Sequence, residues 1–148
     1  MPHLHIIGAG GIGVSAIGRY YQSLGWSVSG SDGAESEITR NLADEGIAIT
    51  IGHARENLQK DTDLVVYTEA IMTKPDLTGD RQSVASDNPE LDEALKRNIR
   101  SLSYPEALAE VSNNKRQIAV TGSHGKSTTT SMIGIMLARS VLGGSTIV

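Results

Sequence analysis

The glycine-rich segment GAGGIG, residues 8–13, restricts the fold of this chain more than any other feature. The run His3–Gly8 before it predicts a strand, and Ile12–Leu24 after it has apolar residues at helical spacing. A glycine-rich turn between a strand and a helix is typical of the first unit of a parallel, nucleotide-binding sheet. The glycines of this loop are Gly8, Gly10, Gly11 and Gly13.

The same alternation of short apolar runs and helical patterns continues along the chain. It predicts an α/β fold, a Rossmann-like parallel sheet with helices on both faces. In such a sheet the carboxyl ends of the strands share one edge, and ligands bind there. The further predicted strands are Trp26–Ser31, Ile47–Ile51, Leu64–Tyr67 and Ile99–Leu102, and the predicted helices are Ser36–Glu45 with Ser36 as N-cap, Pro89–Asn98 and Pro105–Val111.

Composition excludes several classes of protein. The 148 residues contain no Cys, which rules out a disulfide framework and a thiolate metal site and fits a cytoplasmic protein. The net charge of −4 does not favour nucleic acid or a membrane surface as partner. No apolar run is long enough to span a bilayer, and no spacing of His, Asp and Glu predicts a metal site made by the protein alone.

An acidic residue stands where a nucleotide-binding unit would use it. Asp32 ends the second predicted strand, 24 residues after Gly8. A carboxylate at this place accepts hydrogen bonds from ribose hydroxyls. Taken alone, the first loop and Asp32 predict a dinucleotide such as NAD.

A second glycine loop lies near residue 125. Ile118–Thr121 predicts a strand, and a helix is expected from about Gly125 to Arg139. The triplet Gly125-Lys126-Ser127 is typical of loops in which Lys reaches the β- and γ-phosphates of ATP and the hydroxyl binds Mg²⁺. The strict pattern requires Gly at position 120, where this chain has Val. The loop therefore predicts ATP binding by its chemistry and not by an exact motif.

Two phosphate-binding loops are uncommon in so short a chain. With them, the chain resembles the N-terminal part of the Mur ligases of peptidoglycan synthesis. The resemblance runs along most of the chain, and the second loop is its most specific part. Four stretches carry it: HIIGAGGIGVSAIG (5–18), VSGSD (28–32), the region from NPE to YPEALAE (88–110) and TGSHGKSTTT (121–130).

The resemblance implies an activity and a set of roles. In these ligases ATP phosphorylates the carboxylate of a UDP-sugar, and the amine of an amino acid then attacks the acyl phosphate. The most similar member would join L-alanine to UDP-N-acetylmuramate. By similarity the UDP-sugar would be bound by Gly8, Gly10, Gly11, Gly13, Ser31, Asp32, His53, Thr68, Ala70 and Ile71; ATP would be bound by Gly122, Ser123, His124, Gly125, Lys126, Ser127 and Thr128, with Lys126 catalytic and Ser127 on the Mg²⁺ of ATP.

The resemblance also predicts how the chain is organised. Residues 1–111 would form a UDP-sugar-binding domain, and residues 112–148 a linker and the start of a truncated ATP-binding domain. Such a fragment would not turn over alone, and its segment 112–148 would pack on a neighbouring chain, pack irregularly on its own chain or stay mobile. The alternatives are a muropeptide-recycling ligase fragment, a nicotinamide-binding Rossmann domain and a non-catalytic binding module.

The other polar residues are expected mainly to pack in the interior or to face solvent. His3 and His5 are expected to be packed or surface groups, and His53 to face solvent or the uridine. Glu69 stands where the family commonly has a small residue, so it must point away from a diphosphate or serve another contact. The stretch 72–86 is expected to be a surface loop that is longer than usual. The acids Asp87, Glu90, Asp92 and Glu93 are predicted to form a solvated helix start.

Overall fold

The computed structural model describes residues 1–71, 87–113 and 117–140. The chain divides into two compact units, Met1–Glu110 and Val111–Val148. No helix among the described residues is long and apolar enough to cross a membrane. The predicted loop at 72–86 lies outside the described residues.

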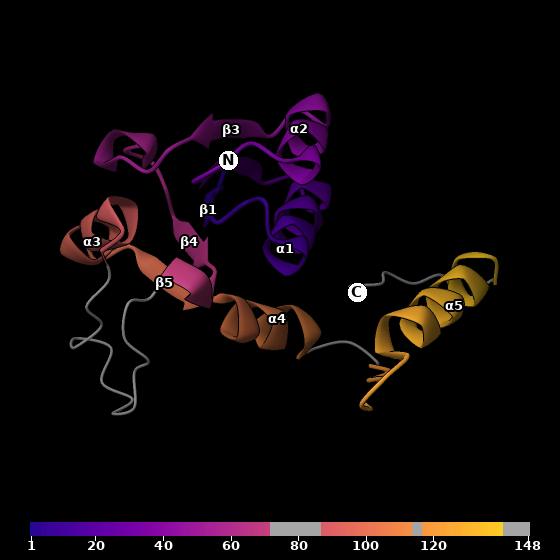
Figure 1. The fold of residues 1–148 in the computed structure, drawn as a ribbon. Coiled ribbons are helices and arrows are strands. Elements are labelled where there is room, and N and C mark those ends of the chain that lie inside the picture. The colour runs from indigo at the N-terminus through magenta and orange to yellow at the C-terminus, as the bar shows by residue number, and fades with distance from the viewer. Residues whose placement is uncertain (72–86, 114–116, 141–148) are drawn as a thin grey trace. The chain divides into compact units, whose positions relative to one another are not determined.

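The first unit is built on one five-stranded sheet in which all neighbouring strands are parallel (Figure 1). The strand order is β3-β2-β1-β4-β5, so the expected Rossmann-like α/β fold is confirmed. Its elements are β1 (His3–Ile7), α1 (Ile12–Ser23), β2 (Ser27–Asp32), α2 (Glu37–Asp44), β3 (Ala48–Ile51), η1 (Arg55–Asn57), β4 (Leu64–Tyr67), η2 (Glu69–Ile71), α3 (Pro89–Lys96), β5 (Arg100–Ser103) and α4 (Tyr104–Ser112).

The strand order reverses between β1 and β4, and this places the candidate site. The chain leaves β1 toward β2 and β3 on one side, whereas β4 and β5 are added on the other. Loops that follow neighbouring strands diverge at such a point and leave a crevice at the carboxyl ends. The glycine loop after β1 and Thr68 after β4 therefore lie at the expected binding edge.

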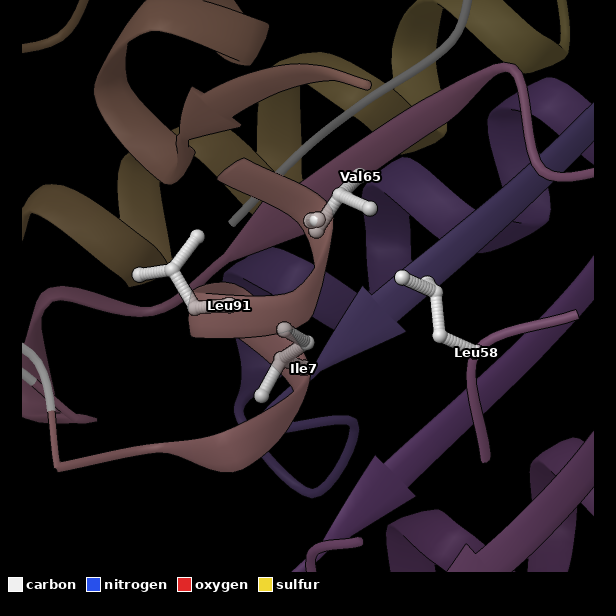
Figure 2. Close-up of a cluster of buried hydrophobic side chains, with 5 residues drawn as sticks. Ile7, Leu58, Val65 and Leu91 are labelled. Carbon is white, nitrogen blue, oxygen red and sulfur yellow. The ribbon is translucent and has the colours of Figure 1, made fainter. Parts of the chain in front are cut away.

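The two faces of the sheet are covered by different helices, as Figure 1 shows for α1 and α3. One face carries Leu4, Ile6 and Val28, and α1 packs on it closely because Gly18 has no side chain. The opposite face carries an apolar cluster under α3 and η1 (Figure 2). The buried members of this cluster are Ile7, Leu58, Val65, Leu91 and Ala94.

Helix α2 begins as its sequence predicts. The Ser36 hydroxyl accepts a hydrogen bond from the Thr39 N–H at 3.2 Å. The Thr39 hydroxyl accepts in return from the Ser36 N–H at 2.8 Å. Two of the N–H groups that a helix start leaves unpaired are thus satisfied, and Ser36 is confirmed as the N-cap.

The second unit contains α5 (Lys126–Ala138), with Gly125 as its N-cap. The predicted strand Ile118–Thr121 is wrong, because the described residues there have no strand structure. An apolar run forms a strand only where a neighbouring strand can pair with its backbone. On α5, Met132, Ile135 and Met136 are exposed, and their predicted role in self-association stays a prediction.

Candidate functional site

The glycine loop after β1 is a tight turn held against the end of β2. Gly8 adopts φ +84°, a backbone conformation that favours glycine. The N–H groups of Gly8 and Ala9 both donate to the Ser31 carbonyl oxygen at 2.9 Å, and the Gly11 N–H donates to the Gly8 carbonyl at 3.0 Å. Helix α1 therefore begins directly after this tight loop.

Asp32 ties this loop to the loop after β2. Its Oδ2 accepts from the Gly10 N–H at 2.7 Å, and its Oδ1 accepts from the Ala34 N–H at 3.1 Å. A Cβ built on Gly10 would lie 2.9 Å from Oδ2, so a larger residue there would displace the carboxylate. The predicted acid at the end of β2 thus lies beside the glycine loop, half-buried.

The start of α1 is suited to an anion. Its N-cap, Gly11, makes no side-chain capping bond, and its first turn contains no acidic residue. The first N–H groups of a helix have no partners within the helix, and they carry the positive end of the helix dipole. A phosphate group bound at this end would accept hydrogen bonds from these groups.

Two side chains from distant parts of the sequence close over the glycines. A Cβ built on Gly8 would lie 2.4 Å from Thr68 Cγ2. A Cβ built on Gly13 would lie 2.4 Å from Cζ and 2.8 Å from the hydroxyl oxygen of Tyr104. Tyr104 begins α4, and sequence reasoning did not connect it with the loop. Gly13 is therefore needed here because the tyrosine ring occupies the space of a side chain.

We expect G13A to destabilise the chain through this contact. Overpacking of a tight contact costs about 1–3 kcal/mol in free energy of unfolding. In the Y104A background the added methyl group has no ring to displace, so the cost of G13A should disappear, since Ala at a helical position is about 0.5–1 kcal/mol more favourable than Gly. Urea unfolding of both single variants and the double variant measures this coupling. Additive effects would show that Gly13 and Tyr104 do not interact.

Glu90 contradicts the prediction of a solvated acid at the helix start. Its side chain is 0% exposed, although Asp92 on the same helix is partly exposed. Its Oε1 accepts from Asn57 Nδ2 at 2.6 Å and from the Ala54 N–H at 3.2 Å. Its Oε2 accepts from the Ser31 hydroxyl. The acid is buried because the ends of β2, η1 and α3 meet around it.

Three groups determine the charge of Glu90. Burial would raise the pKa of this carboxyl, but His5 and the hydroxyl of Ser31, followed by the amide of Asn57, lower it more. The resulting pKa is about 2 instead of 4.5, so Glu90 is an anion at neutral pH.

Acid should therefore weaken the fold through Glu90. A carboxyl whose pKa is lowered in the folded state stabilises it above pH 4.5, and this contribution is lost as pH falls toward about 2. The shift corresponds to about 3 kcal/mol, of which about 1 kcal/mol is lost by pH 3.5. Urea unfolding from pH 7 to pH 3.5 measures it. The variant E90Q cannot ionise, and its stability should fall less over this range by that amount.

Two histidines of β1 extend the group of buried polar side chains around Glu90. His3 and His5 are both 1% exposed and lie on the same face of β1, so they are packed groups. His3 Nδ1 lies 3.1 Å from the Thr62 hydroxyl, and the Ser29 hydroxyl lies 3.0 Å from His3 Nε2 and 2.8 Å from His5 Nδ1. Burial lowers the pKa of His3 against the opposing effect of Asp61. His5 Nε2 is 3.5 Å from Glu90 Oε2 and has no hydrogen-bond partner among the described residues.

The second loop lies in the other unit and is exposed. Gly122 and Gly125 have φ +155° and +76°. The Lys126 ammonium donates to the Gly122 carbonyl at 2.8 Å, so the lysine side chain folds back over its own loop. The first turn of α5 contains no acidic residue. This is a helix start that fits phosphate oxygens, with one cation beside it.

The structure brings part of the predicted UDP-sugar set together. The four loop glycines, Ser31, Asp32 and Thr68 lie at the carboxyl edge of β1, β2 and β4, and His53 joins them through a 3.2 Å contact of its Nδ1 with Ser31 Oγ. Ala70 and Ile71 lie in η2 after β4, and Glu69 there is exposed. No group of three acidic or histidine side chains within the described ranges could hold a metal ion.

The fold is that of the Rossmann-like class of proteins, in which nucleotides bind at the carboxyl ends of the strands. The sequence model of the Mur ligase family, catalytic domain, matches residues 3–116. The chain belongs to the Mur ligase family, as its motifs predict.

Individual relatives agree with this assignment. The chain is 43% identical over 139 residues to a UDP-N-acetylmuramate–L-alanine ligase from Carboxydothermus hydrogenoformans, covering 94% of this chain and 27% of the relative. A solved UDP-N-acetylmuramate-alanine ligase from Thermotoga maritima superimposes with TM-score 0.77 at 32% identity, over 93% of this chain and 29% of that one. A murein peptide ligase from Psychrobacter arcticus gives TM-score 0.74 at 30% identity, with 93% and 26% covered. The chain thus spans little more than a quarter of these relatives.

Proposed function

We propose that the first unit binds UDP-N-acetylmuramate, and that the chain is part of an ATP-dependent ligase that joins this sugar to L-alanine. The observation that carries the proposal is the glycine loop, which lies at the strand-order reversal beside the uncapped start of α1. The similarity to the ligases of Carboxydothermus hydrogenoformans and Thermotoga maritima supports the choice of substrate.

In this proposal, different residues of the edge bind different parts of the ligand. The first N–H groups of α1 would bind the diphosphate, since an anion is favoured at this helix end, and the loop glycines would let the diphosphate approach the backbone. Ser31, Asp32 and His53 would hold the ribose or the base. Thr68, which packs on Gly8, would close the pocket from β4 together with Ala70 and Ile71.

The second loop would bind ATP and its Mg²⁺. The residues fit this role, because two glycines with positive φ precede a helix start that has no acid and carries Lys126. Bound ATP would supply the phosphoryl group that activates the carboxylate of the sugar. Lys126 would neutralise phosphate charge, Ser127 would contribute its hydroxyl to Mg²⁺, and Gly122, Ser123, His124, Gly125 and Thr128 would line the loop.

A nicotinamide-binding domain is the competing function. It would use the same glycine loop and Asp32, but it gives no role to the second loop. A muropeptide ligase is a further candidate, because the chain is similar to the solved murein peptide ligase. It would use the same UDP-sugar edge, and L-alanine-dependent release of phosphate in a full-length protein separates these two ligases.

Calorimetric titration of the 148-residue chain tests the proposal. We expect saturable binding of UDP-N-acetylmuramate, displaced by UDP, and no heat with NADH. The variant K126A should bind UDP-N-acetylmuramate as the unaltered chain does, since Lys126 belongs to the other loop. Binding of NADH without binding of the UDP-sugar would overturn the proposal.

A further inference from the structure

The buried carboxylate of Glu90 determines the hydrogen-bond directions around Ser31. An ionised carboxylate has no proton and can only accept. Ser31 has a single hydroxyl proton, and its contact with Glu90 Oε2 uses that proton. Ser31 Oγ must therefore act as an acceptor in its other contact, the one with His53 Nδ1 at 3.2 Å.

This arrangement assigns a proton to one nitrogen of His53. Nδ1 faces Ser31 Oγ, which can accept only, and it also lies 3.5 Å from Glu90 Oε2, which again can accept only. Both neighbours require a donor, so Nδ1 carries the hydrogen. In a neutral imidazole the other nitrogen, Nε2, then has a free lone pair.

The free lone pair lies at the binding edge. A Cβ built on Gly33 would be 3.9 Å from His53 Nε2, and Gly33 directly follows Asp32. The His53 side chain is 25% exposed, whereas Glu90 is fully buried. The described residues provide no hydrogen-bond partner for Nε2. One end of His53 is therefore fixed in the interior, and the other presents an acceptor beside the residue proposed to hold the ribose.

We propose that Glu90 is a positioning residue which, through Ser31 and through its own 3.5 Å contact with Nδ1, holds His53 in its Nδ1–H form, so that Nε2 accepts a hydrogen bond from an N–H or O–H group of the bound nucleoside. The ligand part rests on the proposed function of the first unit. The tautomer part does not, because it follows from the protein alone. The donor on the ligand is either the N3–H of uracil or a ribose hydroxyl.

The tautomer can be read directly in the free 148-residue chain. Nitrogen-15 NMR of the imidazole at pH 8 distinguishes the Nδ1–H form, the Nε2–H form and the doubly protonated ring. We expect Nδ1–H for His53. Either of the other two forms would overturn the proposal, and no variant is needed for this result.

The variant E90Q tests the role of Glu90. Its amide oxygen can still accept from the Ala54 N–H and Asn57, but its amide nitrogen would donate to Ser31 Oγ. The Ser31 hydroxyl is then free to donate to His53 Nδ1, so His53 should change to the Nε2–H form. The control S31A keeps the carboxylate 3.5 Å from Nδ1, and His53 should stay Nδ1–H. If His53 keeps the Nδ1–H form in E90Q, Glu90 does not set the tautomer.

Binding measurements test the ligand part. The probes are UDP, 2′-deoxy-UDP and UDP methylated at N3 of uracil. Loss of the donor that His53 recognises should weaken binding about tenfold in the unaltered chain and little in E90Q. Equal binding of all three probes would overturn the ligand part. If UDP itself does not bind, the proposed function fails, and the NMR result still decides the tautomer.

Discussion

Replacing Glu90 by Ala should lower the free energy of unfolding by about 2–4 kcal/mol, since several buried hydrogen-bond donors lose the acceptor that they share. The variant leaves the Asn57 amide and the Ala54 N–H without their buried acceptor. It also leaves His5 Nε2 without the anion that lies 3.5 Å away. Urea unfolding followed by circular dichroism measures the difference.

Asp92 provides the matched control, because it is an acid on the same helix. It is partly exposed and pairs with Lys96 four residues later at 2.6 Å. Such surface pairs contribute little to stability, so D92A should be nearly neutral. Equal losses in E90A and D92A would contradict the assignment of Glu90 to the interior.

Gly8→Ala should weaken the binding of UDP-N-acetylmuramate at least about tenfold, the equivalent of about 1.4 kcal/mol. Its added Cβ would lie 2.4 Å from Thr68 Cγ2 and 3.2 Å from Thr68 Cβ, so Thr68 must rotate and shift or the loop must move. The positive φ of Gly8 adds conformational strain of about 1–2 kcal/mol. Calorimetric titration of the variant gives the affinity.

The variant G25A is a control that separates the backbone strain of G8A from its displacement of Thr68. Gly25 has the same φ of +84° as Gly8, but a Cβ added to it, just past the end of α1, would have nothing within 4 Å. G25A should therefore show a similar cost of strain in unfolding and an unchanged affinity. If G8A binds as well as G25A, the glycine loop is not where the diphosphate lies.

Much of the fold follows from local pattern. Short apolar runs that alternate with helical stretches predicted every strand of the described sheet to within a residue or two. The cap at Ser36 and the glycine turn at Gly8 depend on neighbours within a few residues, so the sequence displays them directly. The family was predicted for the same reason, because its motifs are contiguous segments.

The parts that were missed depend on contacts between distant residues. Glu90 has an ordinary position in a helix start, and only the folded sheet shows that it faces Ser31, 59 residues away. A signal was nevertheless present. His3, His5, Ser29 and Ser31 alternate so that they share one face of two adjacent strands. Polar side chains on a buried face require a partner, and an acid on the covering helix is a suitable one.

The predicted strand at Ile118–Thr121 failed for a different physical reason. Its apolar residues suit a strand, but a strand is stabilised by pairing, and the described part of the chain supplies no neighbour for it. Helix α5, whose hydrogen bonds are internal, forms over the predicted range without such a neighbour.

Mapping of UDP-N-acetylmuramate on the first unit by NMR tests the central claim most directly. In amide spectra of the nitrogen-15-labelled 148-residue chain, saturating ligand should shift Gly8, Gly10, Ser31, Asp32 and Thr68. Amides of α5 should remain in place. Shifts confined to residues 122–128, or none with this sugar while NADH shifts the glycine loop, would contradict the account.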